Sequence, residues 1–358
     1  MTGILELPDR IASLEGPARA RADGLLDVRA GVGRTEPPAE LESWLARTFG
    51  SVAAVREQQL LKVTNRVTLE ATLFAPLRQR RPVDGDGRGS DLAAEIAASE
   101  GDPFCEPELG TPAETFGRVR RGGVVSGANA ALADVHHAVL VFDRHDPLAV
   151  ERTLVADVLA AGREWAERAH ATDPDARAYL LIWNCLWRAG GSIVHGHAQA
   201  LLGRGPHYAR PERWRRDAAS YRSIHRASLA DDLVSLHRDL GLAVTVDDVA
   251  LLAHVTPVKE REILVVGAAG SDERDPGFVD AVTRALLALR DQLGVRSFNL
   301  ALWRPPLGDA HGWEDVGPMV RIVDRGDLAS RASDIGAMEL YGTPVVGTDP
   351  YDVAAALT

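Results

Sequence analysis

The sequence predicts an α+β protein with two tandem copies of one small domain, each an antiparallel sheet covered by a helix. Strand-like apolar runs and helix-like amphipathic runs alternate through residues 136–324. The order strand, helix, strand, loop, strand occurs twice, and such a repeat indicates duplication of one unit. We expect a helical N-terminal extension over residues 1–55, a first domain over 56–205 and a second domain over 206–358.

The N-terminal part is predicted to contain helices followed by one strand. Its best amphipathic stretch is ELESWLARTFGSVAAVREQQLL, residues 40–61. The run VTLEATLFAP, residues 67–76, alternates apolar and polar side chains like a strand and stops at a proline. The glycine-rich, charged residues 84–91 that follow predict a loop.

Each copy of the repeat contains one helix between strands. In the first copy, LAVERTLVADVLAAGREWAERAH lies between the strands HHAVLVF and AYLLIWN. The apolar stripe of this helix consists of Val150, Leu154, Val158 and Trp165. In the second copy, PGFVDAVTRALLALRDQLG follows the strand REILVVG and precedes the strands SFNLALW and PMVRIVD. Its proline near the start and its glycine past the end are typical helix boundaries.

The composition indicates a globular protein that acts on small molecules. The 358 residues carry a formal net charge of −11, which argues against nucleic acid or an anionic membrane as the main partner. The two cysteines, Cys105 and Cys185, are too few for a secreted disulfide scaffold. The sequence shows neither a leader pattern nor an apolar run long enough to span a bilayer, so we expect a cytoplasmic location.

The run SIVHGHAQALLG predicts a strand that carries His195, His197 and Gln199. Side chains two residues apart project from the same face of a strand, so we expect these three to converge. A neutral imidazole is a nucleophile near neutral pH and can carry a covalent phosphate intermediate. A glutamine beside it can donate to a phosphate oxygen, which favours group transfer over hydrolysis. The alternative is a pair of structural histidines on an ordinary strand.

Four separated segments resemble motifs of one family. They are APLRQRRP at residues 75–82, DPFCEPELGTP at 102–112, NCLWRAGGSIVHGHAQ at 184–199 and ASDIGAMELYGTPVVGTDPYDVAAAL at 332–357. In this order they are similar to the galactose-1-phosphate uridylyltransferase branch of the histidine-triad superfamily, which includes sugar-nucleotide and dinucleotide phosphorylases. The resemblance implies that both predicted domains are histidine-triad-like and that only the first is catalytic.

The resemblance also implies roles for individual residues. His197 matches the family's nucleophile, and Gln199 matches the residue that binds a phosphate oxygen. Guanidinium groups suit phosphate oxygens, and the positions that match the family's phosphate contacts are Arg78, Arg81, Asn184 and Ser192. The alternatives are a solvated basic run for the two arginines, and turn and strand-end hydrogen bonds for the other two residues.

By the same resemblance, the ligands of a structural zinc ion match Asp102, Cys105, His145 and His195. Aspartate replaces one cysteine of the family motif, and its oxygen is an acceptable zinc ligand, so we expect zinc to be retained. The alternative is a lost site, with Asp102 as a loop or cap residue and Cys105 as a small buried one. Gly196 replaces a proline of the family motif. The last strand of the second copy has Met319 and Arg321 in place of the paired histidines, so we expect no second metal, and no organic cofactor.

Together these points predict a nucleotidyltransferase. His197 attacks the α-phosphorus of a nucleoside diphosphate sugar and expels a sugar 1-phosphate, and a second sugar 1-phosphate then takes the nucleotide from the histidine. The nearest alternative is a phosphorylase, in which inorganic phosphate is the acceptor, and a further one is a nucleotide-binding protein without turnover. Hydrolysis is disfavoured because histidine-triad hydrolases have a third histidine where Gln199 stands. The resemblance also implies a homodimer whose subunits share their active sites, with nucleotide sugars and sugar phosphates as ligands.

Overall fold

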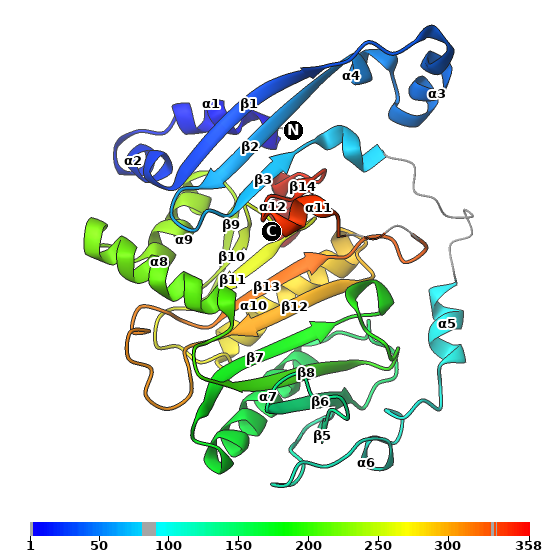
Figure 1. Ribbon diagram of the computed structural model, residues 1–358, viewed down its shortest axis with the longest axis vertical. Coiled ribbons are helices and arrows are strands. Elements are labelled where there is room, and N and C mark those ends of the chain that lie inside the picture. The colour runs from blue at the N-terminus through cyan, green and yellow to red at the C-terminus, as the bar shows by residue number, and fades with distance from the viewer. Residues whose placement is uncertain (1–2, 81–90, 331–332, 334) are drawn as a thin grey trace.

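The computed structural model describes residues 3–80, 91–330, 333 and 335–358. Over these residues the chain forms a ten-stranded antiparallel sheet and a separate four-stranded sheet (Figure 1). In the larger sheet the strand order is β4-β5-β6-β8-β7-β12-β13-β11-β10-β9. In chain order its strands are β4 (Arg120–Arg121), β5 (Val124–Ala128), β6 (His136–Phe142), β7 (Ala176–Asn184), β8 (His197–Arg204), β9 (Ala243–Val246), β10 (Val249–Ala253), β11 (Ile263–Val266), β12 (Phe298–Trp303) and β13 (Met319–Asp324).

The large sheet consists of two equivalent halves that meet at β7 and β12. Read outward from this junction, the first half is β7-β8-β6-β5-β4 and the second is β12-β13-β11-β10-β9. The junction is antiparallel, and Asn184 pairs with Asn299 at one end of it. The predicted α+β class and the tandem repeat are therefore confirmed. The domain boundaries stay a prediction, because both halves contribute strands to one continuous sheet.

The strand register defines which residues of the two halves are equivalent. His197 begins β8 and pairs with Val141 of β6. Met319 begins β13 and pairs with Val266 of β11. Met319 is therefore the equivalent of His197, and not of the first histidine of the motif. The expected alignment of the two copies was shifted by two residues, because the motif by itself does not show where the strand begins.

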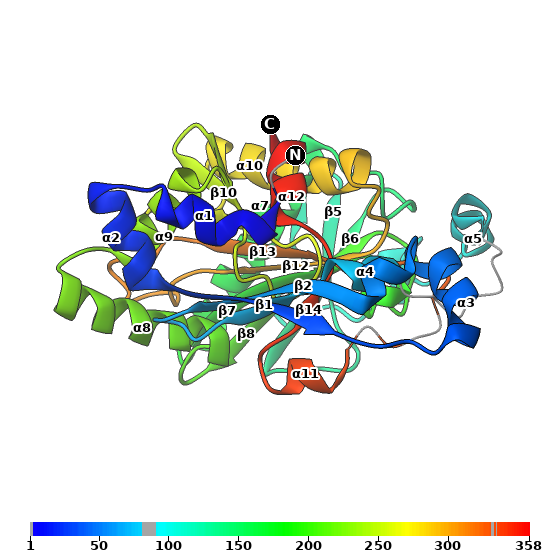
Figure 2. The same ribbon diagram turned by 90° about the horizontal axis from the view of Figure 1, so that it is seen from above.

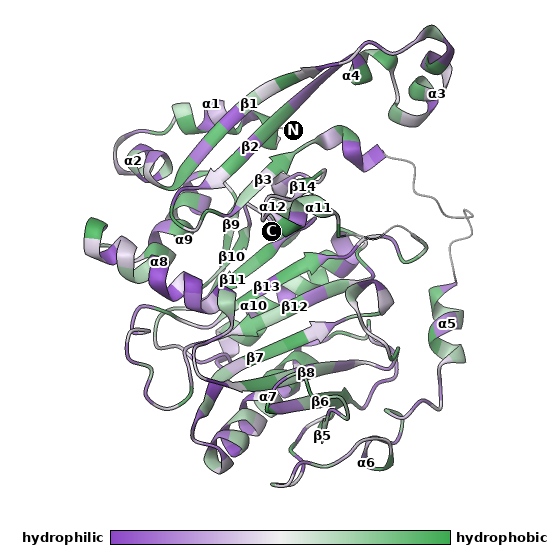
Figure 3. Cartoon of the chain, in the orientation of Figure 1, coloured by the Kyte–Doolittle hydropathy of each residue, from purple (hydrophilic) through white to green (hydrophobic). Residues whose placement is uncertain are grey.

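One face of the large sheet is covered by two long helices, α7 (Arg152–Thr172) and α10 (Pro276–Leu287) (Figure 2). The predicted stripe of the first helix is buried, with Val150, Leu154, Val158 and Trp165 at most 5% exposed. Trp165 also donates its indole N–H to Glu114 Oε1 at 2.7 Å. The second helix ends in a short π-helical turn, η4 (Ala288–Gln292), before the predicted glycine. Figure 3 shows that the strands beneath these helices are mostly hydrophobic.

The smaller sheet has the order β1-β2-β3-β14 and includes strands that the sequence did not predict. Its members are β1 (Leu26–Arg34), β2 (Glu57–Asn65), β3 (Ala71–Phe74) and β14 (Val345–Val346). The N-terminal extension is therefore not wholly helical, and the stretch 40–61 ends as a strand. Strand β1 contains two glycines among its nine residues, which weakens the local preference for a strand. Pairing with β2 along its whole length provides the backbone hydrogen bonds.

The other elements are short helices around the two sheets. Those before β4 are η1 (Ile4–Glu6), α1 (Leu7–Ala12), α2 (Gly16–Leu25), α3 (Ala39–Phe49), α4 (Val52–Arg56), η2 (Pro76–Arg80), α5 (Leu92–Ala98) and α6 (Pro107–Gly110). Those after β7 are η3 (Trp187–Ala189), α8 (Ala209–His225), α9 (Leu229–Asp239), α11 (Ala337–Leu340) and α12 (Pro350–Leu357). Among the described residues, no helix combines the length and the apolarity that crossing a membrane requires.

Candidate active site

His197 lies at the first position of β8, on the sheet face that α7 and α10 leave open. Its ring is 6% exposed. Nδ1 lies 2.8 Å from the carbonyl oxygen of His195, to which it donates. Within the described residues, Nε2 makes no hydrogen bond, yet it is not one of the buried unpartnered atoms. Burial lowers the pKa of His197, so at neutral pH the ring is neutral and Nε2 carries a lone pair.

An aromatic side chain that the sequence argument missed restricts the ring of His197. Phe104 packs edge-on against it, with the ring centroids 4.9 Å apart and the planes at 74°. Phe104 is itself 7% exposed and packs with Val139 and Val141. It belongs to the segment DPFCEPELGTP, so its place in that motif was the only available signal. The apolar contact shields one side of the imidazole and leaves fewer orientations for the ring.

The prediction that one strand carries His195, His197 and Gln199 is wrong for His195, which lies before the strand. The strand begins only at His197, and residues 191–196 are irregular. Here Phe142 N–H donates to the carbonyl of Gly196 at 3.0 Å, and Gly196 N–H donates to the carbonyl of His145 at 3.1 Å. A Cβ atom on Gly196 would lie 2.7 Å from the Phe142 ring and 3.1 Å from the carbonyl oxygen of Arg144. Glycine therefore allows this segment to pack closely against Phe142 and the backbone of Arg144.

Gln199 lies on β8 two residues after His197 and is held by His137 of β6. The amide oxygen Oε1 of Gln199 lies 2.9 Å from His137 Nε2. Ala133 N–H donates to His137 Nδ1 at 3.1 Å, so the ring proton must reside on Nε2. Asn129 Nδ2 also lies 3.3 Å from Nε2 of His137. The backbone N–H of Ala133 can only donate, however, so Nδ1 must accept, and this contact decides the tautomer. Oε1 of Gln199 thus accepts from His137, and its amide N–H groups stay available to a phosphate oxygen.

The predicted phosphate contacts come from separate segments of the chain. Asn184 ends β7, and its Oδ1 accepts from Asn299 Nδ2 at 2.7 Å. Ser192 is exposed in the loop before β8. Arg78 lies in η2, which follows β3 of the smaller sheet. Arg81 lies outside the described residues. The phosphate roles of these four residues therefore stay predictions.

Two polar residues of the second half lie beside Asn184 at the junction of the halves. Asn299 of β12 donates to Asn184 and also to the carbonyl of Ala189 at 2.8 Å. Arg325, just past β13, donates to Asn299 Oδ1. The sequence argument missed both, because only the pairing of β7 with β12 brings them beside the first half. The loop before β8 is therefore braced by residues that lie more than 100 positions later in the chain.

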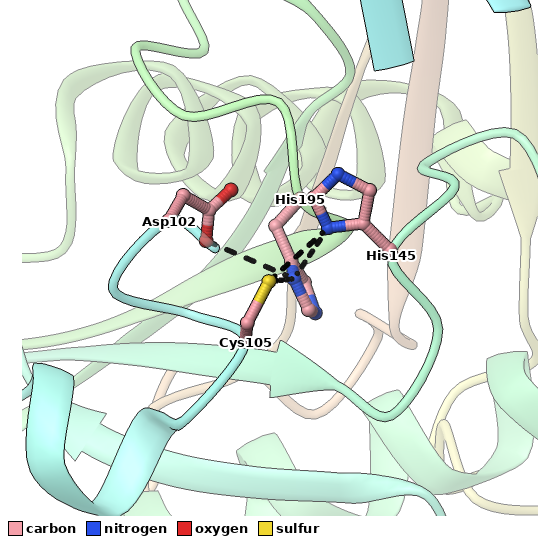
Figure 4. Close-up of side chains that lie close together, drawn as sticks. All are labelled: Asp102, Cys105, His145 and His195. Carbon is pink, nitrogen blue, oxygen red and sulfur yellow. Dashed lines mark hydrogen bonds and ion pairs between the residues drawn. The ribbon is translucent and has the colours of Figure 1, made fainter. Parts of the chain in front are cut away.

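Four of the predicted residues form a compact cluster near His197 (Figure 4). Asp102 and Cys105 lie on one loop, His145 on a second and His195 before β8, and one donor atom of each lies within 4.8 Å of the others. Cys105 Sγ is 3.5 Å from His145 Nδ1 and 3.6 Å from His195 Nδ1. Asp102 Oδ1 is 3.8 Å from His195 Nδ1. These separations fit donors at the corners of a tetrahedron around a zinc ion.

The hydrogen bonds of the two histidines support a cation between them. His195 Nε2 lies 2.8 Å from the Phe142 carbonyl, and His145 Nε2 lies 3.0 Å from the Ile96 carbonyl, so both Nε2 atoms are donors. Both Nδ1 atoms then carry lone pairs, and they lie 3.0 Å apart. Asp102 Oδ2 is buried without a partner among the described residues. A metal ion between the two lone pairs and the buried carboxylate oxygen would remove their mutual repulsion.

Known structures share this fold. An ADP-glucose phosphorylase from Arabidopsis thaliana with bound ADP-glucose matches with a TM-score of 0.64 and 15% identity, over 83% of this chain and 97% of that chain. A GalT-like protein from Arabidopsis thaliana matches with a TM-score of 0.56 and 15% identity, over 72% of this chain and 91% of that chain. A uridylyltransferase matches with a TM-score of 0.56 and 16% identity, over 83% and 97%. No protein-family model and no curated protein matches the sequence.

These matches confirm the predicted resemblance in fold to a GalT-like protein and a uridylyltransferase. Their coverage extends over both halves of the chain, since 83% of it aligns with the ADP-glucose phosphorylase. At such low sequence identity the matches concern the fold. The activity must therefore be argued from the site.

Proposed function

We propose that the protein transfers nucleoside monophosphate groups by way of a covalent bond to His197. The single observation that carries the proposal is the geometry of this ring, with Nδ1 held by a carbonyl and Nε2 left without a partner among the described residues. The donor is a nucleoside diphosphate sugar and the acceptor a second sugar 1-phosphate. The fold matches support this class of substrate, since one of them is named for ADP-glucose and holds it.

The first half-reaction follows from the protonation of the site. Nε2 of His197 forms a bond to the α-phosphorus, the bond from that phosphorus to the bridging oxygen breaks, and sugar 1-phosphate leaves with the electron pair. Gln199 donates an amide N–H to a non-bridging oxygen, because its Oε1 is already occupied by His137. In the second half-reaction the acceptor's phosphate oxygen attacks the same phosphorus and His197 leaves. Arg78, Arg81, Asn184 and Ser192 are proposed to bind the remaining phosphate oxygens.

The donor set described above fits zinc, and we propose that Asp102, Cys105, His145 and His195 hold one zinc ion with a structural role. A bound zinc ion would cross-link the two loops and the residue before β8. The backbone carbonyl of His195 also accepts a hydrogen bond from Nδ1 of His197. The cluster therefore positions the nucleophile. The predicted homodimer remains a prediction that analytical ultracentrifugation tests.

A phosphorylase, with inorganic phosphate as acceptor, is the second candidate function. The observation in its favour is the likeness in fold to a protein named ADP-glucose phosphorylase. Both reactions share the nucleotidyl-histidine and differ only in the second half-reaction. After the adduct has formed, sugar 1-phosphate and inorganic phosphate are offered separately, and the faster loss of the adduct identifies the acceptor.

Intact-protein mass spectrometry tests the nucleophile. The full-length protein is incubated with UDP-, ADP-, GDP- and dTDP-sugars in turn, and one of them is expected to add the mass of one nucleoside monophosphate. His197→Asn abolishes the adduct, while His311→Asn, at a histidine whose side chain is 93% exposed, retains it. Tight binding with no adduct in any incubation would identify a nucleotide-binding protein without turnover.

A further inference from the structure

A cavity of about 820 Å³ lies over the second half of the large sheet, and no residue of β7 or β8 lines it. It lies between α8, the turn at residues 65–70 and the segment 335–344. In Figure 2, α8 and α11 lie on the side of the sheet opposite α7 and α10. Its volume is within the range of small-molecule sites.

The position of this cavity is equivalent to that of the candidate active site. Met319 and Arg321 of β13 line it, together with Trp303 of β12. Met319 is the register equivalent of His197, so Arg321, two residues further on, is the equivalent of Gln199. The second copy therefore has an open site in the same place, without the nucleophile. Such a site can bind a ligand, but Met319 cannot form the covalent bond.

Buried charges at the floor of the cavity are arranged around Arg321. Its Nη2 lies 3.0 Å from Glu70 Oε1, and its Nη1 lies 2.9 Å from Glu262 Oε1. Two carboxylates therefore neutralise this guanidinium. His254, 2% exposed, lies 3.4 Å from Glu70 Oε2, and its Nδ1 is buried without a partner among the described residues. A buried ring nitrogen with no partner, on a residue that lines the cavity, is typical of a site that a ligand or water completes.

Two more guanidinium groups enter the cavity from α8. Arg210 and Arg213 lie one turn apart on the same helix face and both line the cavity. Arg210 shares the carboxylate of Glu70 with Arg321. Arg213 lies 3.7 Å from Asp217, which is a loose ion pair. Arg321 also pairs with Glu262, so Arg210 and Arg213 are the guanidiniums whose donor groups are less fully engaged. An anion bound to them would reduce the repulsion between Arg210 and Arg321.

Aromatic rings contribute to the apolar lining of the cavity. Trp303 is 8% exposed and is fixed by an edge-on contact with Trp313, with the ring centroids 6.2 Å apart. Trp214 lies next to Arg213 on α8 and also lines the cavity. Indole faces stack well on flat aromatic rings, including all the nucleobases.

We propose that this cavity is a second nucleotide site, which binds a nucleoside phosphate without transferring it. The base packs against Trp214 and Trp303, and the phosphate binds to Arg210 and Arg213. Paired guanidiniums suit a phosphate, and the aromatic rings beside them suit a base. The proposal goes beyond the reaction proposed for His197 and does not depend on it, because the two sites have no lining residue in common.

Equilibrium dialysis of the full chain with AMP, GMP and UMP tests this site. The double variant Arg210→Ala, Arg213→Ala is compared with Arg216→Ala, which lies on the same helix, pairs with Glu212 and does not line the cavity. For at least one of the nucleotides, we expect the double variant to bind one molecule per chain fewer than the unaltered protein does. Arg216→Ala is expected to bind the same number of molecules as the unaltered protein. The matching nucleoside, which lacks the phosphate, is expected to bind the cavity at least tenfold more weakly.

The difference in stoichiometry separates this proposal from the function proposed for His197. The double variant is expected to form the His197 adduct like the unaltered protein, so the two sites fail independently. Equal stoichiometry in the double variant and the unaltered protein for all three nucleotides would overturn the proposal. A loss of the same size in Arg216→Ala, or equal affinity for nucleoside and nucleotide, would overturn it as well.

Discussion

The proton on each histidine ring determines what the candidate site can do. His197, His195 and His137 each have one nitrogen whose role a backbone group fixes. The result is one lone pair on Nε2 of His197, one lone pair on Nδ1 of His195 and one N–H of His137 that donates to Gln199. The spacing of His195, His197 and Gln199 made them recognisable in the sequence. The contact of His137 with Gln199 was not recognisable there, because it joins two strands and the run around His137 looks like an ordinary strand.

His137 is expected to be a positioning residue for Gln199. His137→Ala removes the donor to Gln199 Oε1, so the amide can rotate and the rate of adduct formation should fall roughly tenfold to hundredfold. The matched control is His136→Ala, because His136 is the next residue on the same strand and pairs with Asp173 instead. Rapid-quench measurement of the adduct against time gives the rate.

A purely structural role for His137 would alter the melting temperature and not the rate per folded molecule. His137→Gln, which can still donate an N–H to Gln199, should recover part of the rate. Equal rates for His137→Ala and the unaltered protein would contradict the assignment.

At the scale of elements, three chain segments without regular structure form the metal cluster. The loops that carry Asp102, Cys105 and His145 meet the residue before β8 only in the folded chain. Such a cluster could be expected from the motifs by resemblance, and the distances now show that the four donors converge. The strand β1 shows a different case. Its apolar residues alternate with charged residues or glycines, but the glycines weaken this local signal, and β1 pairs with β2 along its whole length.

Zinc content is the measurement for this cluster. The protein purified from zinc-supplemented medium is expected to hold about one zinc per chain by mass spectrometry of the metal, and Cys105→Ala should hold at least tenfold less. Cys185→Ala is the matched control, because Cys185 is 1% exposed and lies outside the cluster. Burial also raises the pKa of the Cys185 thiol, so it is a poor metal ligand.

A second readout does not depend on activity. Bound zinc should protect the Cys105 thiol from a thiol reagent, and a chelator should expose it. A metal-free protein in zinc-rich medium, or unchanged zinc in Cys105→Ala, would contradict the expectation.

At the scale of the whole molecule, the two copies form one sheet and share one core. The junction of β7 and β12 joins them by backbone hydrogen bonds, and Arg325 and Asn299 of the second half support the first. The two copies carry different groups at the equivalent positions of the sheet. One has a neutral histidine with a lone pair, and the other has a cavity with a neutralised arginine.

The stability of the whole fold is expected to fall in mild acid, in part because of His237. This ring is fully buried, its Nδ1 donates to the Leu233 carbonyl at 2.8 Å, and its Nε2 accepts from Val255 N–H at 3.1 Å. Burial, followed by the nearby His254, lowers the pKa of His237 from 6.5 to about 3. Below about pH 6.5 the unfolded chain therefore binds a proton on His237 that the folded chain does not bind. This group then lowers the free energy of unfolding by about 1.4 kcal/mol for each pH unit.

Urea denaturation between pH 8 and pH 5 measures this effect. His237→Gln keeps one donor and one acceptor but cannot be protonated, so its free energy of unfolding should decline less steeply as the pH falls. At pH 8 its free energy of unfolding should be lower than that of the unaltered protein, because the amide does not fill the space of the buried ring. The control His311→Gln changes an exposed ring and should decline like the unaltered protein. Parallel curves for His237→Gln and the unaltered protein would show that another group controls the acid sensitivity.

The sequence by itself determined the class of the fold, the duplicated unit, the main strands and helices of both copies and the candidate residues His197 and Gln199. These depend on the periodicity of apolar residues and on motifs within short stretches, which local chain geometry preserves. Only the tertiary structure decided the start of β8, the equivalence of His197 with Met319, the support from His137 and Asn299, and the cavity of the second half. Each of these depends on strand register and on contacts between residues far apart in the chain, and no local pattern specifies them.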